Sequence, residues 1–468
     1  MEKTAESAES ALEKTLNASG KPVKDASDPV RSLEKAGEYL LRPASNGAKK
    51  AGQYWQMLGP GLTTGAADDD PSGIATYSQT GAQYGFGLLW LAAFTFPLMA
   101  VVQEMCARIG LVTGRGLAGN IKRHYPKKVL YTVTALLFLA NTFNIGADLG
   151  AMAKAAQLLW PNFSFTLLIF FFTILSLVLQ IFTSYKDYAK YLKWLALVLM
   201  SYVLTAFFVR VDWRAVLTSA FLPHLTFSPG QIFLVCGILG TTISPYLFFW
   251  QTSQEVEEEI LQGKTTIKLR QTETTDLEVK KMRVDIWSGM FFSNLAMFFI
   301  ILVCAATLFN AGLTNIQTAA EAATALRPLA GQYAFFLFAV GIIGVGLLAV
   351  PVLAGSASYA LSESFGWKQG LCHKFKKARA FYGVIILSMV IGLILNFVGL
   401  DPIKALIYSA VANGIIAPVI LVLIVHMSDN KKIMGVRKNG RAISALGWIT
   451  CAVMILASVA TIASLMIS

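Results

Sequence analysis

Long apolar runs, separated by short polar stretches, follow one another from residue 57 to the end of the sequence. Three runs without a charged side chain are Leu130–Asn144, Leu195–Val209 and Ala334–Leu361. A helix needs about 20 apolar residues to cross the ~30 Å hydrocarbon layer of a membrane. In that layer every backbone group must be satisfied within the protein, which favours helices. The pattern therefore predicts an all-α membrane protein.

Eleven membrane spans can be drawn along the sequence. They are 57–80, 86–109, 129–159, 162–183, 191–210, 230–252, 285–309, 333–361, 380–398, 402–427 and 442–466. Spans 1 to 5 (57–210) and 6 to 10 (230–427) are predicted to be the two halves of an inverted repeat, followed by an eleventh helix at 442–466. A charged, solvated loop is predicted at 254–283, where four glutamates stand between residues 255 and 259. Residues 1–50 are predicted to be a polar, disordered tail without a secretory signal.

The composition agrees with a membrane protein. Only 14% of the 468 residues are charged, whereas soluble proteins average about 25%. The five cysteines, which lack the spacing of zinc sites, are interpreted as small apolar residues. Neither an enzymatic activity nor a bound cofactor is expected.

The basic residues predict the orientation in the membrane. All but five of the 39 Lys and Arg residues lie in the tail or beside the loops after the even-numbered spans. The five exceptions are Lys154, Arg210, Arg214, Arg327 and Lys404. Since cytoplasmic loops carry the excess of Lys and Arg, we predict a cytoplasmic N-terminus and an external C-terminus in a plasma membrane, such as a bacterial inner membrane. The same asymmetry explains the net charge of +12 without nucleic acid.

Two of the predicted spans contain prolines that interrupt a helix. The first span holds Asp68-Asp69-Asp70-Pro71, and the sixth holds Thr241-Thr242-Ile243-Ser244-Pro245. A broken helix is tolerated at membrane depth only where it is buried in protein or lines a cavity. Paired interruptions at matching places in two halves are the best sequence indication of a transporter's central site. A proline kink that serves packing alone is the alternative.

Chain polarity predicts the chemistry of the two breaks. The first half of each broken span points its C-terminal end, which is electrostatically negative, at the middle of the membrane. Free carbonyl groups there, together with the carboxylate of Asp70, favour a cation. Asp68 and Asp69 either line the approach of cations or pair with a neighbouring span. For Asp148, an ion pair with Lys154 and a role in permeation both remain open.

Around these residues the sequence resembles the natural resistance-associated macrophage protein (NRAMP) family of metal transporters. The resemblance extends from about residue 57 to 440 and implies a LeuT-type fold with eleven helices. Its motifs are Gly59-Pro60-Gly61, Asp70-Pro71, Gly81-Ala82-Gln83-Tyr84-Gly85, Leu88-Leu89-Trp90, Cys106-Ala107-Arg108-Ile109-Gly110, Thr113-Gly114-Arg115, Ser428-Asp429 and Lys432-Ile433-Met434-Gly435.

The sequence also departs from the pattern of that family at its functional positions. The resemblance implies that Gly73 replaces an asparagine ligand, Ser244 a methionine ligand, and Tyr246 a histidine linked to proton movement. Ile145 and Asp148 stand near an aspartate and a glutamate of the proton route. Near Ala410 the family has a glutamine ligand, and Asn413 lies one turn further on. These departures resemble the NRAMP-related magnesium transporter branch, which works without proton coupling.

The sequence therefore predicts a transporter, expected to be a monomer, that imports Mg²⁺ and also Mn²⁺ by alternating access. Asp70 is expected to supply charge, Ala67 and Thr241 carbonyl groups, and Ser244 and Thr242 hydroxyl groups, with Gly73 leaving room for a partly hydrated ion. Mg²⁺ usually keeps several of its waters, and oxygen ligands suit it better than a thioether. The alternatives are a proton-coupled Mn²⁺/Fe²⁺ symporter, a non-transporting sensor, and an organic-cation or amino-acid carrier.

Overall fold

The computed structural model describes residues 59–182 and 200–467, and the regular structure of these residues is entirely helical. The predicted all-α class is confirmed. Eight helices in the described part of the chain are long and apolar enough to cross a membrane, whereas the count of eleven spans remains a prediction. The predicted tail 1–50 and residues 191–199 of the fifth predicted span lie outside the described residues.

Within the described residues, helices occupy the predicted spans, although the helices on either side of residues 254–283 extend well into that stretch. The longer single helices are α5 (Trp90–Thr113), α7 (Lys127–Leu159), α8 (Phe165–Phe182), α15 (Asp276–Cys304), α18 (Ala334–Phe365), α19 (Arg379–Leu395), α20 (Pro402–Asp429) and α22 (Arg441–Ile467). The first span consists of α3 (Pro60–Asp68) and α4 (Pro71–Tyr84), and the sixth of α12 (Pro229–Thr242) and α13 (Pro245–Leu261). The short helices are α6 (Leu117–His124), α10 (Met200–Phe208), α11 (Trp213–Phe221), α14 (Ile267–Glu273), α16 (Ala319–Ala323), α17 (Arg327–Ala330) and α21 (Lys431–Met434).

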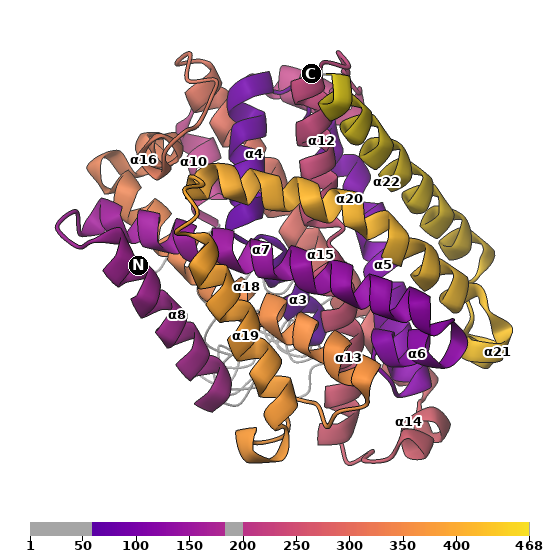
Figure 1. Cartoon of the computed structure of the whole chain (residues 1–468). Coiled ribbons are helices and arrows are strands. Elements are labelled where there is room, and N and C mark those ends of the chain that lie inside the picture. Colours follow the sequence, from indigo (N-terminus) through magenta and orange to yellow (C-terminus); the bar gives the residue numbers. More distant parts are fainter. Residues whose placement is uncertain (1–58, 183–199, 468) are drawn as a thin grey trace, which may run out of the picture. The chain divides into compact units, whose positions relative to one another are not determined.

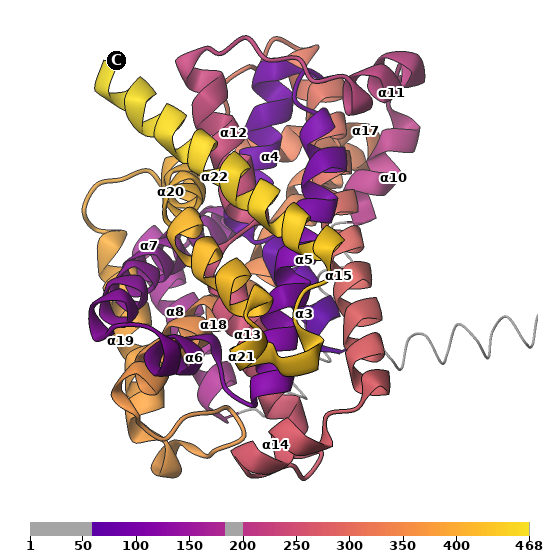
Figure 2. The ribbon, with the colours of Figure 1, turned by 90° about the vertical axis from the view of Figure 1, so that its right-hand side faces the viewer.

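The two interrupted spans run in opposite directions through the middle of the bundle. In Figures 1 and 2, α4 and α12 lie toward one end of the bundle, and α3 and α13 toward the other. The breaks therefore meet between the two ends. Around them, α7 packs against α18, α19 and α20, while α3 packs against α15 and α12 against α20. This arrangement encloses the residues at both breaks.

A close contact between α12 and α20 depends on glycine. A methyl group on Gly240 would overlap the carbonyl oxygen of Ala410 and the backbone nitrogen of Gly414. Small residues at such places let the backbones of membrane helices approach closely. Gly240 thus brings the end of α12 against the middle of α20.

We expect Gly240→Ala to destabilise the protein by about 1–3 kcal/mol, because overpacking of a tight contact forces the backbones apart. The measurement is thermal unfolding of the purified protein in detergent. Gly383→Ala in α19 is the matched control, since a methyl group there would meet no atom within 4 Å. Equal stability of the two variants would contradict the importance of the α12–α20 contact.

The prediction of a solvated loop at 254–283 is wrong at both ends. Helix α13 continues to Leu261 and α15 begins at Asp276, with α14 between them. Three of the four glutamates of α13, Glu255, Glu257 and Glu259, are buried and have partners. Glu257 accepts hydrogen bonds from the Tyr359 hydroxyl group (2.8 Å) and the backbone of Leu371 (2.9 Å), and Glu259 pairs with Lys264 at 3.4 Å.

Candidate functional site

The first break is a helix start built around Asp70. Helix α3 ends at Asp68, and Asp70 is the N-cap residue of α4, with Pro71 as its first residue. Aspartate at an N-cap and proline at the first helical position are both favoured. One carboxylate oxygen of Asp70, Oδ1, accepts hydrogen bonds from the Ser72 hydroxyl group (2.6 Å) and the Gly73 backbone (2.7 Å). These two bonds fix the orientation of the carboxylate.

The second oxygen of Asp70 is held by residues that the sequence analysis did not single out. Asn144 on α7 donates to Asp70 Oδ2 at 2.9 Å. The amide oxygen of Asn144 in turn accepts a hydrogen bond from Ser409 on α20 at 2.7 Å. The signal for Asn144 was an amide in a largely apolar span, since polar groups in membrane spans commonly bond across helices.

The second break lies against the first. Helix α12 ends at Thr242 and α13 begins at Pro245. The Ser244 hydroxyl group is within bonding distance of the Thr241 carbonyl oxygen (2.7 Å), and the Tyr246 hydroxyl group donates to the carbonyl oxygen of Ala67 at 2.9 Å. Both predicted carbonyl ligands therefore lie at the breaks. The Ala67 carbonyl oxygen already accepts one hydroxyl proton, whereas the Ser244 proton is shared between the carbonyl oxygens of Gly240 (2.6 Å) and Thr241 (2.7 Å). A carbonyl oxygen has a second lone pair for another partner.

Gly73 and Asn413 also face this region. A methyl group on Gly73 would lie 3.0 Å from Thr241 Oγ1, so the start of α4 touches the end of α12, and this contact takes up the room that was predicted beside Gly73 for a hydrated ion. Asn413 is 1% exposed, and its amide oxygen has no hydrogen-bond partner among the residues described. It follows Ser409 by one helical turn and so lies on the same side of α20.

Three predicted site residues have other contacts. The Thr242 hydroxyl group donates to the carbonyl oxygen of Ile238 in its own helix at 2.8 Å. Ile145 packs against Gly392 of α19. A methyl group added to Gly392 would lie only 2.9 Å from Cγ2 of Ile145. Ala410 presents its backbone carbonyl group to α12, as described for Gly240. These contacts contribute to the packing around the breaks.

Four carboxylates are buried around the first break. Asp68, Asp69, Asp70 and Asp148 are each at most 2% exposed. Asp68 accepts a hydrogen bond from Ser293 on α15 at 2.6 Å, whereas both oxygens of Asp148 have no partner within residues 59–182 and 200–467. An isolated buried carboxylate is very costly, so four of them in one region favour a bound cation.

No basic side chain of the described residues forms a salt bridge with these four carboxylates. Lys154, the sequence candidate for pairing with Asp148, instead lies over the ring of Phe165 at 5.2 Å. In the described part of the chain, the ion-pair interpretation of Asp148 therefore finds no support. Farther away, Glu104 pairs with Arg283 at 2.9 Å.

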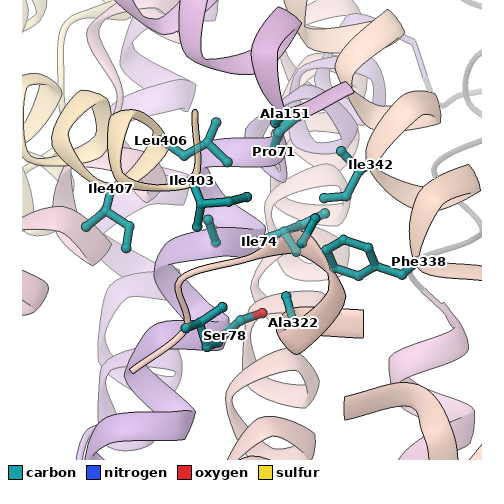
Figure 3. A pocket seen from close by; sticks show the side chains of 13 residues that line it. Pro71, Ile74, Ser78, Ala151, Ala322, Phe338, Ile342, Ile403, Leu406 and Ile407 are labelled. Carbon is teal, nitrogen blue, oxygen red and sulfur yellow. The ribbon is translucent and has the colours of Figure 1, made fainter. Parts of the chain in front are cut away.

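An apolar cavity adjoins the first break, and Figure 3 shows Pro71 and Ile74 of α4 facing Phe338, Ile342 and Ile403 across it. A more polar cavity lies beside it. Both are lined by Ala319 and Ile403, and the more polar one is also lined by Lys154, Gln157, Gln317, Thr318 and Asp401. The two cavities thus share two lining residues, and the apolar one reaches Pro71, next to Asp70.

A family model described as "Natural resistance-associated macrophage protein-like" matches residues 61–464. The chain belongs to this family. Among curated NRAMP relatives, the "Divalent metal cation transporter MntH" of Deinococcus radiodurans is 27% identical, with 91% of this chain and 94% of the relative covered. The protein of the same name from Bacillus subtilis is 25% identical, with coverages of 85% and 90%.

Solved structures agree on the fold of this NRAMP chain. A manganese transporter of Eremococcus coleocola superposes with a TM-score of 0.67 at 17% identity and covers 87% of this chain and 86% of its own. The inward-facing structure of Mhp1 superposes with a TM-score of 0.50 at 14% identity, with coverages of 86% and 90%. The predicted LeuT-type fold is thereby confirmed.

Proposed function

We propose that this NRAMP chain transports divalent metal ions across the membrane, with Mg²⁺ as the principal substrate and Mn²⁺ as a second one. The observation that carries the proposal is Asp70, a buried carboxylate between two interrupted spans, with no salt bridge to a described basic residue. Family membership supports it, as do the names of the relatives, which are divalent metal cation transporters. An ionisable residue at membrane depth commonly marks an ion pathway.

The residues at the breaks favour a hard cation. Around Asp70 the groups able to contact an ion are oxygens: the carbonyl groups of Ala67 and Thr241, the hydroxyl group of Ser244, and the amide oxygen of Asn413. Oxygen ligands suit Mg²⁺ and Mn²⁺, whereas a thioether selects softer metals. We infer that water completes the shell, because Mg²⁺ dehydrates reluctantly.

The ion is proposed to move by alternating access, with α3 and α4 shifting relative to α12 and α13. The cavities beside Pro71 would supply the external route, and Asp68 and Asp69 would attract the cation toward Asp70. A membrane potential of 100 mV contributes about 2.3 kcal/mol per charge, hence about 4.6 kcal/mol for a divalent ion. That energy corresponds to more than a thousandfold accumulation, so proton coupling is not needed.

A proton-coupled Mn²⁺ symporter is the second candidate, and Asp148 is the observation that favours it. Its carboxylate is fully buried and without a hydrogen-bond partner among the described residues, so it could hold a proton. Against this role, Tyr246 occupies the position where proton-coupled relatives are expected to carry histidine, and its hydroxyl group donates to the carbonyl oxygen of Ala67. A phenolic hydroxyl group does not exchange protons readily at neutral pH, unlike an imidazole.

We expect Mg²⁺ and Mn²⁺ uptake into proteoliposomes without acidification of the lumen. The measurement compares Mg²⁺, Mn²⁺ and Ca²⁺ side by side, with one dye for the metal and another for internal pH. A potassium diffusion potential, negative inside, should accelerate uptake, while a pH gradient should leave the rate unchanged. Acidification that follows metal uptake would instead establish the coupled symporter.

The proposed topology places the N-terminus in the cytoplasm and the C-terminus outside, with the protein acting as a monomer. In Figure 2 the C-terminal end of α22 lies toward the end of the bundle that holds α4 and α12, opposite α14. Helix α14 belongs to a loop rich in Lys and Arg, and such loops lie on the cytoplasmic side. The opposite end of the bundle, where α22 ends, would then be external.

A further inference from the structure

Asn144 connects three helices at the centre of the bundle. Its side chain is fully buried. The amide nitrogen, Nδ2, donates to Asp70 Oδ2 at 2.9 Å, and the amide oxygen, Oδ1, accepts from Ser409 Oγ at 2.7 Å. Both ends of the amide are therefore engaged, one with the first break and the other with α20.

The hydrogen bonds of Asp70 leave one oxygen for a cation. Oδ1 is fixed by the start of α4, where Ser72 and the Gly73 backbone donate to it. Oδ2 points to α7, and the only donor recorded for it in the described residues is the Asn144 amide. A cation that binds the remaining lone pair of Oδ2 lies beside this amide, and its positive charge favours the amide oxygen over the N–H group as the atom that faces it.

Ser409 offers the amide a second arrangement. Its hydroxyl group lies 2.7 Å from the Asn144 amide oxygen and 2.7 Å from the carbonyl oxygen of Leu406. A hydroxyl group has one proton, so it can donate fully to only one of them, and it has lone pairs that accept. If Ser409 donates to Leu406, its oxygen is free to accept a hydrogen bond from the NH₂ group of Asn144.

We propose that Asn144 is a ligand of the transported ion and turns its amide by half a turn when the ion binds. Without the ion, Nδ2 donates to Asp70. With the ion, Oδ1 faces the cation beside Asp70, Nδ2 donates to Ser409, and Ser409 donates to Leu406. Asp70 Oδ2 and both ends of the Asn144 amide keep a partner in both states. This inference rests on the proposed function, namely that a divalent cation binds at Asp70.

The packing at the first break supports an amide ligand from α7. Gly73 has no side chain, and even a methyl group there would approach Thr241 Oγ1 to 3.0 Å. The first turn of α4 therefore has little room for a ligand of its own. An amide oxygen from Asn144 adds a neutral ligand to the carboxylate, in keeping with the oxygen ligands that Mg²⁺ and Mn²⁺ prefer.

Asn144→Asp separates a ligand from a residue that merely positions Asp70. The substitution keeps the shape but replaces the NH₂ group with a second carboxylate oxygen. If Asn144 is a ligand, the ion gains a charged partner, so the Kd for Mn²⁺ should fall about tenfold and the maximal uptake rate should also fall because release slows. If Asn144 only donates to Asp70, the variant loses the donor and places two carboxylates together, so the Kd should rise.

The experiment is isothermal titration of purified protein with Mn²⁺ and with Mg²⁺, followed by uptake into proteoliposomes. Asn144→Leu removes both amide groups and is expected to raise the Kd by at least about 10-fold, since even residues that only orient a metal ligand contribute about 10- to 100-fold. An unchanged Kd of Asn144→Leu would overturn the proposal, also where Asn144→Asp cannot be purified. Asn141→Ala on the same helix is the control, because Asn141 donates to the carbonyl oxygen of Leu353 on α18, and its Kd should match the wild type.

Asp70→Asn in the same series separates this inference from the proposed function. If Asp70→Asn loses binding and Asn144→Asp has a raised Kd, only the ligand role of Asn144 is ruled out. Full binding and uptake in Asp70→Asn would remove the proposed site itself, and with it the ligand role of Asn144.

Discussion

Asp70→Asn is expected to abolish uptake of Mg²⁺ and Mn²⁺ while leaving the fold intact. Asparagine is as good an N-cap as aspartate, so the bonds from Ser72 and Gly73 can persist. The substitution removes only the charge. The ion loses its fixed counter-charge. Since even a hydrogen bond to a charged group contributes about 1.5–3 kcal/mol, a Kd at least about a hundredfold higher is expected.

The measurement for Asp70→Asn is metal uptake into proteoliposomes together with the shift of the melting temperature on adding Mn²⁺. Asp212→Asn is the matched control, because Asp212 is also an N-cap aspartate that accepts hydrogen bonds from the backbone of Arg214 and Ala215, at the start of α11. The control should retain both uptake and the shift. Normal uptake by Asp70→Asn would mean that the ion binds elsewhere.

The helix ends at the two breaks could be predicted from the sequence because proline acts locally. Pro71 and Pro245 cannot donate to a helix that continues through them. Helix α3 ends at Asp68 and α12 at Thr242, within the stretches where the prolines predicted an interruption. The capping role of Asp70 is equally local, since aspartate before proline is typical of a helix start.

The contacts of the site across helices could not be predicted in the same way. Asn144 meets Asp70 from 74 positions away in the sequence and Ser409 from 265 positions away. A single sequence does not reveal the rotation of one helix about its axis relative to another. The burial of Glu257 escaped prediction for the same reason, since its partners Tyr359 and Leu371 lie more than 100 residues further along the chain.

The N-terminal end of α3 depends on one carboxylate of α15. Asp285 accepts hydrogen bonds from the backbone nitrogens of Gly59 (2.8 Å), Gly61 (2.6 Å) and Leu62 (3.1 Å). Helix α3 has only nine residues, and a helix this short is marginal without such support. The first N–H groups of a helix have no partner within it, and a carboxylate at this end also interacts favourably with the helix dipole.

We expect Asp285→Ala to lower the free energy of unfolding by about 3 kcal/mol, because buried donors of α3 lose a charged acceptor. The thermal midpoint in detergent measures this effect. Asp276→Ala at the start of α15 is the control. The Asp276 side chain is 98% exposed and pairs with Arg437, and surface pairs contribute at most about 1 kcal/mol.

Asp285→Ala is also expected to change transport, because the opposite end of α3 carries Asp68 and precedes Asp70. Once released at Gly59 and Gly61, α3 can move away from α15 at a smaller free-energy cost. The equilibrium should therefore shift toward conformations in which the first break is open on the side of α3. Faster reaction of a cysteine introduced at Thr64, beside Gln251, with a water-soluble thiol reagent would report this shift in a background that lacks the five native cysteines. An unchanged reaction rate, together with an unchanged melting temperature, would mean that Asp285 does not hold α3 in place.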